Sequence, residues 1–118
     1  MRFAKLYSNM EVYNNPEITL LVKANNKIAD SEFCAYMVKN SPKTYFCFGF
    51  VKVTETLLQN ERIFVAPSNS VQCSSLVFYG ATNGILSPLL YNNGYFIIPN
   101  ISKLAADYYY VSGSFAIK

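Results

Sequence analysis

The chain lacks histidine and tryptophan and carries little charge, and each of these shortages narrows its chemistry. Without histidine there is no His-based general base, no Ser-His or Cys-His nucleophile pair, and none of the usual zinc sites. Charged residues make up only 14% of the 118 residues, whereas disordered chains combine much charge with few apolar residues. No apolar run reaches the ~20 residues that a membrane-spanning helix needs. The sequence therefore favours one folded domain, residues 1–118, that is not inserted in a membrane.

Acidic residues are also scarce, with two aspartates and five glutamates in the whole chain. A glycosidase needs two carboxyl groups about 5–10 Å apart, and Glu55 and Glu61, on either side of a predicted loop, suit that spacing best. We interpret them as solvated loop charges, and we expect Arg62 to pair with Glu55. No phosphate-binding loop, metal-ligand spacing or nucleophile elbow is present. We therefore expect no enzyme, no catalytic or metal site and no cofactor.

Basic residues and cysteines carry no motif either. The net charge is +3 and no two of the ten Lys and Arg residues are adjacent, which argues against a nucleic-acid partner. Cys34, Cys47 and Cys73 form no CxxC pair, and we interpret them as buried thiols that pack as small hydrophobic groups. One disulfide with a leftover thiol is the alternative.

Apolar residues, at 52%, and aromatic residues, at 16%, are by contrast abundant, and they alternate with polar ones or run in short blocks. This pattern, with turn clusters between the blocks, predicts an all-β fold, an antiparallel and jelly-roll-like β-sandwich. Asn93-Gly94 predicts a type I′ hairpin turn, and helix is limited to one turn at Ser102–Ala106. The predicted strands are Arg2–Tyr7, Glu17–Lys23, Glu32–Lys39, Lys43–Thr54, Glu61–Ala66, Val71–Tyr79, Ile85–Tyr91, Tyr95–Ile98 and Tyr108–Ile117.

One predicted strand, Tyr45–Val53, is apolar on both faces. Cys47 and Val51 lie on one face, and Phe46, Phe48 and Phe50 lie on the other until Lys52 ends the run. A small antiparallel sandwich normally leaves one face of each strand to solvent, and a monomer rarely exposes a patch of several hundred Å². We therefore expect the three phenylalanines to be covered by a neighbouring subunit or by a loop of the same chain.

The order of motifs from residue 45 to 118 resembles the C-terminal domain at the tips of bacteriophage tail fibres, baseplate receptor-binding proteins and head fibres. Its most specific part is the closing Tyr110-Val111-Ser112-Gly113-Ser114-Phe115, and the Pro67-Ser68 and Asn93-Gly94 positions support it. The residues before the Pro-Ser pair, Val65-Ala66, depart from the family pattern. Residues 1–44 match nothing in that family, so their role is left open.

The resemblance implies a non-enzymatic viral structural protein, a homotrimer exposed on the phage virion that binds host-surface carbohydrate or decorates the capsid. In that picture Phe46, Phe48 and Phe50 are core or interface residues. Two alternatives stay open at this point. One is a permanent capsid auxiliary subunit that reaches other virion proteins through residues 1–44, and the other is a β-barrel that binds a small hydrophobic ligand.

Tyrosine and asparagine side chains in loops or on outward faces are the candidates for carbohydrate contact. A tyrosine ring offers a flat apolar surface and a hydroxyl group, which suits saccharides and protein partners alike. Each tyrosine can instead pack across strands, and the hairpin turn alone explains the asparagines. The candidates are Tyr79, Tyr91, Asn92, Asn93, Tyr95, Tyr108 and Tyr110.

Overall fold

The computed structural model of the protein describes residues 18–67, 71–99 and 103–118, and every regular element in those ranges is a β strand. The strands are β1 (Ile18–Leu20), β2 (Val22–Lys23), β3 (Cys34–Ser41), β4 (Thr44–Val53), β5 (Leu57–Leu58), β6 (Arg62–Val65), β7 (Val71–Ser74), β8 (Val77–Gly80), β9 (Leu86–Pro88), β10 (Leu90–Asn92), β11 (Tyr95–Ile97), β12 (Lys103–Leu104) and β13 (Asp107–Ile117). The predicted strand Arg2–Tyr7 lies outside the described residues. The described part of the chain contains no helix able to cross a membrane.

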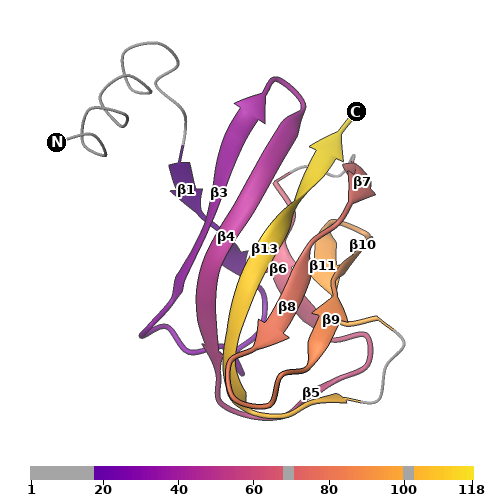
Figure 1. The fold of residues 1–118 in the computed structure, drawn as a ribbon. Helices are drawn as coiled ribbons and strands as arrows, with labels where there is room; N and C mark the ends of the chain where they lie inside the picture. The colour runs from indigo at the N-terminus through magenta and orange to yellow at the C-terminus, as the bar shows by residue number, and fades with distance from the viewer. Residues whose placement is uncertain (1–17, 68–70, 100–102) are drawn as a thin grey trace, which may run out of the picture.

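The strands form two large antiparallel layers (Figure 1). The front layer is a seven-stranded sheet in the order β1-β3-β4-β13-β8-β9, with β7 also paired to β13. The rear layer is a four-stranded sheet in the order β10-β11-β6-β2, and β12 pairs with β5 in a separate ribbon. This arrangement confirms the all-β antiparallel sandwich that the sequence predicts.

Aromatic side chains fill the space between the two layers. Phe64 of the small sheet meets Phe78 of the large sheet edge-on at 5.9 Å between ring centroids, and Phe96 lies 5.2 Å from Phe115. All four rings are buried, and each contributes about 2–3 kcal/mol relative to an exposed ring. Tyr109 of β13 is also buried among these rings.

Residues 18–44, whose role the sequence left open, are part of this sandwich. β1 pairs with β3 in the large sheet, and β2 pairs with β6 in the small sheet, so one continuous segment borders both layers. Leu21, between β1 and β2, is buried and donates its backbone N–H to the carbonyl of Ala35. The described part of the N-terminal region is therefore not an arm that extends away from the domain.

Two local predictions have different outcomes. Asn93 and Gly94 have φ angles of 50° and 88° and join β10 directly to β11, as a type I′ turn requires. Ser102 lies outside the described residues, but for the rest of Ser102–Ala106 the predicted helical turn is wrong, because Lys103–Leu104 is a strand that pairs with Leu57–Leu58. A two-residue strand has too little sequence pattern to be recognised, since its partner alone makes it extended.

Candidate functional site

The outward side of β4 carries the three phenylalanines of the doubly apolar strand. Cys47 and Val51 point into the core and are buried, whereas Phe46 and Phe48 point outward and are 50% and 45% exposed. Phe50, on the same side, is partly buried. No segment of the described chain covers Phe46 or Phe48, so a loop of the described residues is not their cover.

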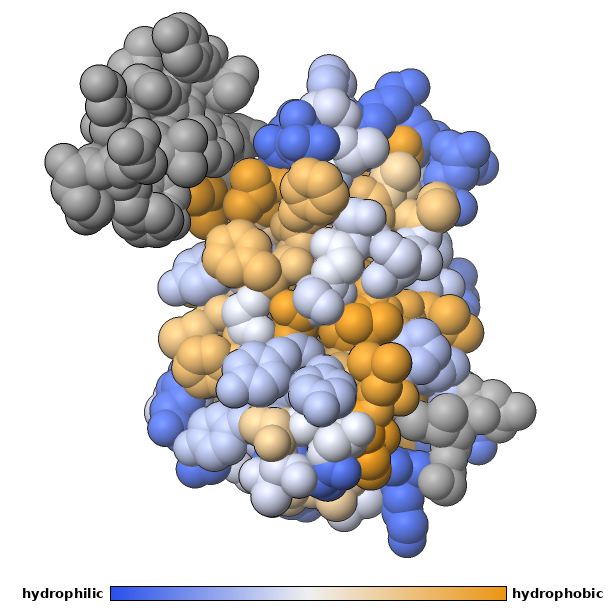
Figure 2. Space-filling view, viewed as in Figure 1, coloured by the Kyte–Doolittle hydropathy of each residue, from blue (hydrophilic) through white to orange (hydrophobic). Residues whose placement is uncertain are grey.

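Neighbouring strands extend this apolar surface in both directions. The register places Tyr36 beside Phe48, Tyr110 beside Phe50, and Tyr79 beside Tyr110. We call the outward side of the large sheet the aromatic face; its large apolar and aromatic members are Ile18, Leu20, Tyr36, Val38, Phe46, Phe48, Phe50, Val77, Tyr79, Leu86, Tyr108 and Tyr110. Figure 2 views the molecule from this side and shows apolar and weakly polar side chains across the middle of the sheet, with strongly hydrophilic residues towards its ends.

The rings on the aromatic face are ordered by contact with one another. Tyr36 and Phe48 stack at 5.6 Å between centroids with an interplanar angle of 26°, and Phe50 lies 6.4 Å from Tyr108. Cross-strand aromatic pairs of this kind stabilise a sheet and hold the rings in fixed positions. These four rings therefore lose little conformational entropy when they are buried.

A small polar group borders the face where β3 and β13 begin and β4 ends. Tyr108 donates its hydroxyl hydrogen to Glu32 at 2.9 Å, and Lys52 lies 3.5 Å from the same carboxylate and 5.7 Å from the centre of the Tyr108 ring. The hydrogen bond to Glu32 raises the pKa of the Tyr108 phenol, because an ionised phenol could not donate it. Positive and negative charge thus compensate each other at this border.

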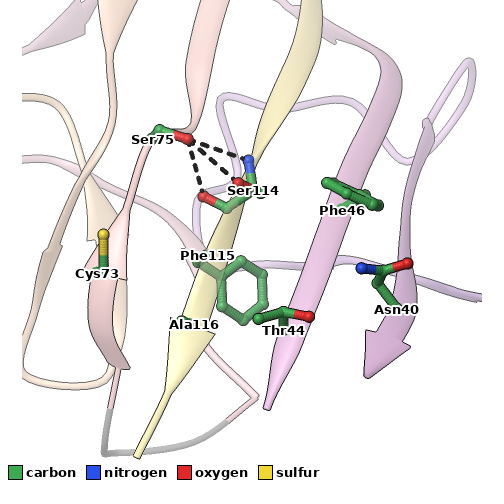
Figure 3. A pocket seen from close by; sticks show the side chains of 8 residues that line it. All are labelled: Asn40, Thr44, Phe46, Cys73, Ser75, Ser114, Phe115 and Ala116. Carbon is green, nitrogen blue, oxygen red and sulfur yellow. Dashed lines mark hydrogen bonds between the residues drawn. The ribbon is translucent and has the colours of Figure 1, made fainter. Parts of the chain in front are cut away.

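A hollow of about 200 Å³ lies on the opposite end of the face, where the outward residues are small (Figure 3). Its lining includes Ser114 and Ala116 of β13, with Phe46 from β4 on one side and Cys73 from β7 on the other. The backbone N–H of Ser75 donates to the carbonyl of Ser114 at 2.8 Å, and the two hydroxyl groups lie 3.4 Å apart. No charged side chain is among the described residues that line the hollow.

The predicted carbohydrate contacts fall into two separate groups. Tyr79, Tyr108 and Tyr110 lie together on the aromatic face, but the other four belong to the β10–β11 hairpin of the small sheet. The latter group comprises Tyr91, Asn92, Asn93 and Tyr95. The sequence alternation could not show this division, because only the tertiary pairing decides which sheet a strand joins.

The hairpin group offers little open ring surface. Tyr91 packs edge-on against Phe96 at 6.2 Å, and Tyr95 lies under the Arg62 guanidinium, which is 4.1 Å from its ring centre. The predicted pairing of Arg62 with Glu55 is therefore replaced by a cation–π contact. Asn92 and Asn93 are exposed at the turn.

The carboxylate of Glu61 is held by hydrogen bonds within the fold. Glu61 accepts hydrogen bonds from Lys27 Nζ at 2.8 Å, from the Leu58 backbone N–H at 2.7 Å and from Asn25 at 3.1 Å. These bonds occupy both oxygens of the carboxylate, so Glu61 holds the segments that carry Asn25, Lys27 and Leu58 in place. Within the described ranges, no three His, Cys, Asp or Glu side chains cluster as metal ligands would.

All three cysteines are free thiols, and only one of them fits the prediction of burial fully. Cys47 is buried, and desolvation raises the pKa of its thiol to about 12, so it stays protonated. Cys34 is half-buried, and Cys73 is exposed on β7. Period-2 alternation places Cys47 inside, but the exposure of Cys73 depends on its position in β7, which has β13 as its paired neighbour in the large sheet.

Several members of the aromatic face were missed by the sequence reasoning. Tyr36 and Val38 alternate with inward residues along β3, and this signal was present in the sequence. Leu20 and Leu86 lie within predicted strands, but the strands that form there have three residues each, too few for alternation to show which side faces outward.

Comparison with protein-family models, with curated proteins and with solved structures finds no match to this chain.

Proposed function

We propose that this protein is a non-catalytic structural subunit that assembles with identical copies through the aromatic face. The observation that carries the proposal is the contiguous exposure of large apolar and aromatic side chains on one sheet. Leu20, Phe46 and Tyr110 are each about half exposed, and Leu86 is 64% exposed. Contiguous apolar patches larger than a few hundred Å² on a soluble protein mark interaction surfaces.

The chemistry of the face fits a protein partner. Interface cores are depleted of charged residues and enriched in tyrosine and phenylalanine, and this composition describes the middle of the face. Four of the rings, Tyr36, Phe48, Phe50 and Tyr108, are already ordered in pairs, so association does not have to immobilise them. Because the exposed rings are already about half buried, each gains about 1–1.5 kcal/mol on association, and several such side chains together offset the entropy lost.

The more specific proposal is a virion component, a fibre-tip or capsid-decoration subunit that forms homotrimers. It is supported by the resemblance of the closing strand, Tyr110-Val111-Ser112-Gly113-Ser114-Phe115, and by the apolar face on the same sheet. If assembly buries the aromatic face, the carbohydrate candidates left at the surface are those of the β10–β11 hairpin, above all Asn92 and Asn93. A glycan array without binding would remove the adhesive role and leave the structural one.

Size-exclusion chromatography with light scattering tests assembly. The wild-type chain is expected to run as a homo-oligomer at micromolar concentration, and Phe48→Ser as a monomer with unchanged circular dichroism. Leu58→Ser is the matched control, because Leu58 is 50% exposed on β5, outside the aromatic face. A monomeric wild-type chain would contradict the proposal.

A further inference from the structure

The aromatic face carries a projection and a hollow on the same strand, β13. Tyr110 is 53% exposed and projects from the face, while the hollow lies over Ser114 and Ala116 further along the strand. Ser112, a small residue, lies halfway between Tyr110 and Ser114 on the same side. Because side chains on one side of a strand recur about every 6.8 Å, the projection and the hollow are each about 7 Å from Ser112.

The hollow suits a neutral ring that carries a hydroxyl group. Phe46 supplies an apolar wall, and the Ser75 and Ser114 hydroxyl groups supply hydrogen-bonding atoms at the other side (Figure 3). The described lining contains no charged group, so nothing there would favour an anion or a metal ion. A tyrosine side chain has this combination of an apolar ring and one polar end.

We propose that two copies of the chain pack face to face about a twofold axis that crosses β13 at Ser112. The axis lies in the plane of contact and runs across the strands. It therefore places Tyr110 of each copy opposite Ser114 of the other, so that each tyrosine enters the partner's hollow. This inference rests on the proposed self-assembly through the aromatic face, and it assigns that face a twofold dimer in place of the homotrimer that the family resemblance implies. An interface of this kind is isologous, because both copies use the same surface.

The size of the face agrees with a stable dimer. The strands of the large sheet are three to eleven residues long and lie about 4.8 Å apart, and at about 3.4 Å per residue they cover roughly 600 Å² for each copy. Two copies together would bury about 1,200 Å², at the lower end of the range for stable specific complexes. The charged pair at the border, Glu32 and Lys52, is internally compensated, so like charges do not oppose contact between identical faces.

Thiol cross-linking with light scattering tests the symmetry. Ser112→Cys, in a background with Cys34→Ser and Cys73→Ser, places one thiol of each copy at the axis. Packed sheets lie about 10 Å apart, too far for a disulfide but within reach of a short bis-maleimide. We expect a mass of two chains and efficient linkage into dimers. Asn92→Cys in the same background is the control and is expected to give no linked dimer.

Two substitutions test the projection and the hollow separately. Tyr110→Ala removes the projection and Ser114→Trp fills the hollow, and each is expected to weaken dimerisation at least about tenfold. Circular dichroism checks that both variants fold. A trimer by light scattering, or a dimer that Ser112→Cys does not link, would overturn the twofold arrangement but leave self-assembly in place. A monomer would overturn both.

Discussion

At the scale of single residues, Gly49 in the middle of β4 is required by the backbone around it. Its φ is 114°, a value that side-chain-bearing residues rarely adopt. A Cβ added there would lie 1.8 Å from the carbonyl oxygen of Cys34 on β3. The close approach of the two strands at this point therefore depends on the absence of a side chain.

Gly49→Ala is expected to lower the free energy of unfolding by about 3 kcal/mol or more, since both strain and a backbone clash oppose it. Gly84→Ala is the matched control. Gly84 also has a positive φ, of 70°, but a Cβ there meets no atom within 4 Å, so a loss of only about 1–2 kcal/mol is expected. Urea denaturation of both variants measures the difference, and equal losses would show that the clash with Cys34 is relieved at no cost.

Glu61 gives the protein a dependence on acid. Partial desolvation raises the pKa of its carboxyl group, but the hydrogen bonds from Lys27, Leu58 and Asn25 outweigh this and hold the pKa below its ordinary value of 4.5. A carboxylate with a lowered pKa in the folded state stabilises the protein at pH above 4.5. That stabilisation is lost as the pH falls below 4.5 through the folded-state pKa.

Glu61→Gln is therefore expected to lower the free energy of unfolding by about 1–2 kcal/mol at pH 7, because Lys27 loses a charged partner that is only about one-quarter exposed. The difference from wild type should shrink as the pH falls below 4.5. Denaturation at several pH values measures it. Glu55→Gln, at an exposed glutamate, is the control and should change stability little at any pH. A difference for Glu61→Gln that does not vary with pH would contradict this account.

At the scale of elements, β13 is the centre of the large sheet. It pairs with β4 from Asp107 to Ala116, and its other side pairs with β8 and β7. β1, in contrast, is a three-residue strand at the edge of the same sheet, with β3 as its paired neighbour there. Opening β13 would break two ladders of hydrogen bonds, whereas β1 opens by breaking one.

Native-state hydrogen exchange should rank the strands accordingly. The amides of Tyr109 and Val111 are expected to exchange only through global unfolding, because they lie in the doubly paired, buried part of β13. The amide of Thr19, which pairs with Met37 in the β1–β3 ladder, should exchange through a local opening of lower free energy. NMR or mass spectrometry measures both. Equal protection of β1 and β13 would show that the sheet opens as one unit.

The elements also show which sequence signals are sufficient to predict a strand or a turn. The two sides of the long alternating segment Tyr45–Val53 were separated correctly, with Cys47 and Val51 on one side and the phenylalanines on the other, since alternation directly encodes the two sides of a strand. The type I′ turn at Asn93-Gly94 was predicted because few residue pairs tolerate positive φ at both positions. The short strands β5 and β12 could not be predicted, because their extended form depends on each other.

At the scale of the whole molecule, the large sheet presents one apolar side to the core and a second to the exterior. Tyr109 and Phe115 belong to the first side, and Tyr110 and Phe48 belong to the second. If the second side assembles as proposed, the chain gains stability from assembly as well as from folding. The two contributions can be separated by concentration, because association depends on concentration and the folding of a monomer does not.

Thermal unfolding of the wild-type chain should therefore depend on protein concentration. Each tenfold increase is expected to raise the melting temperature by about 3 °C, from the unfolding entropy of two chains of this size. Phe48→Ser should melt at a temperature independent of concentration, and Leu58→Ser should behave as wild type does. A wild-type melting temperature that is constant over a hundredfold range would contradict coupled folding and assembly.

The sequence by itself determined the all-β class, the two apolar sides of β4 and the polar turn between β10 and β11, because these follow from local alternation and local backbone preference. Only the tertiary structure decided that Tyr36, Tyr79 and Leu86 join the phenylalanines in one face, and that Tyr91 and Tyr95 do not. The register between strands far apart in the chain is fixed by packing of the complete core, and no local pattern contains that information.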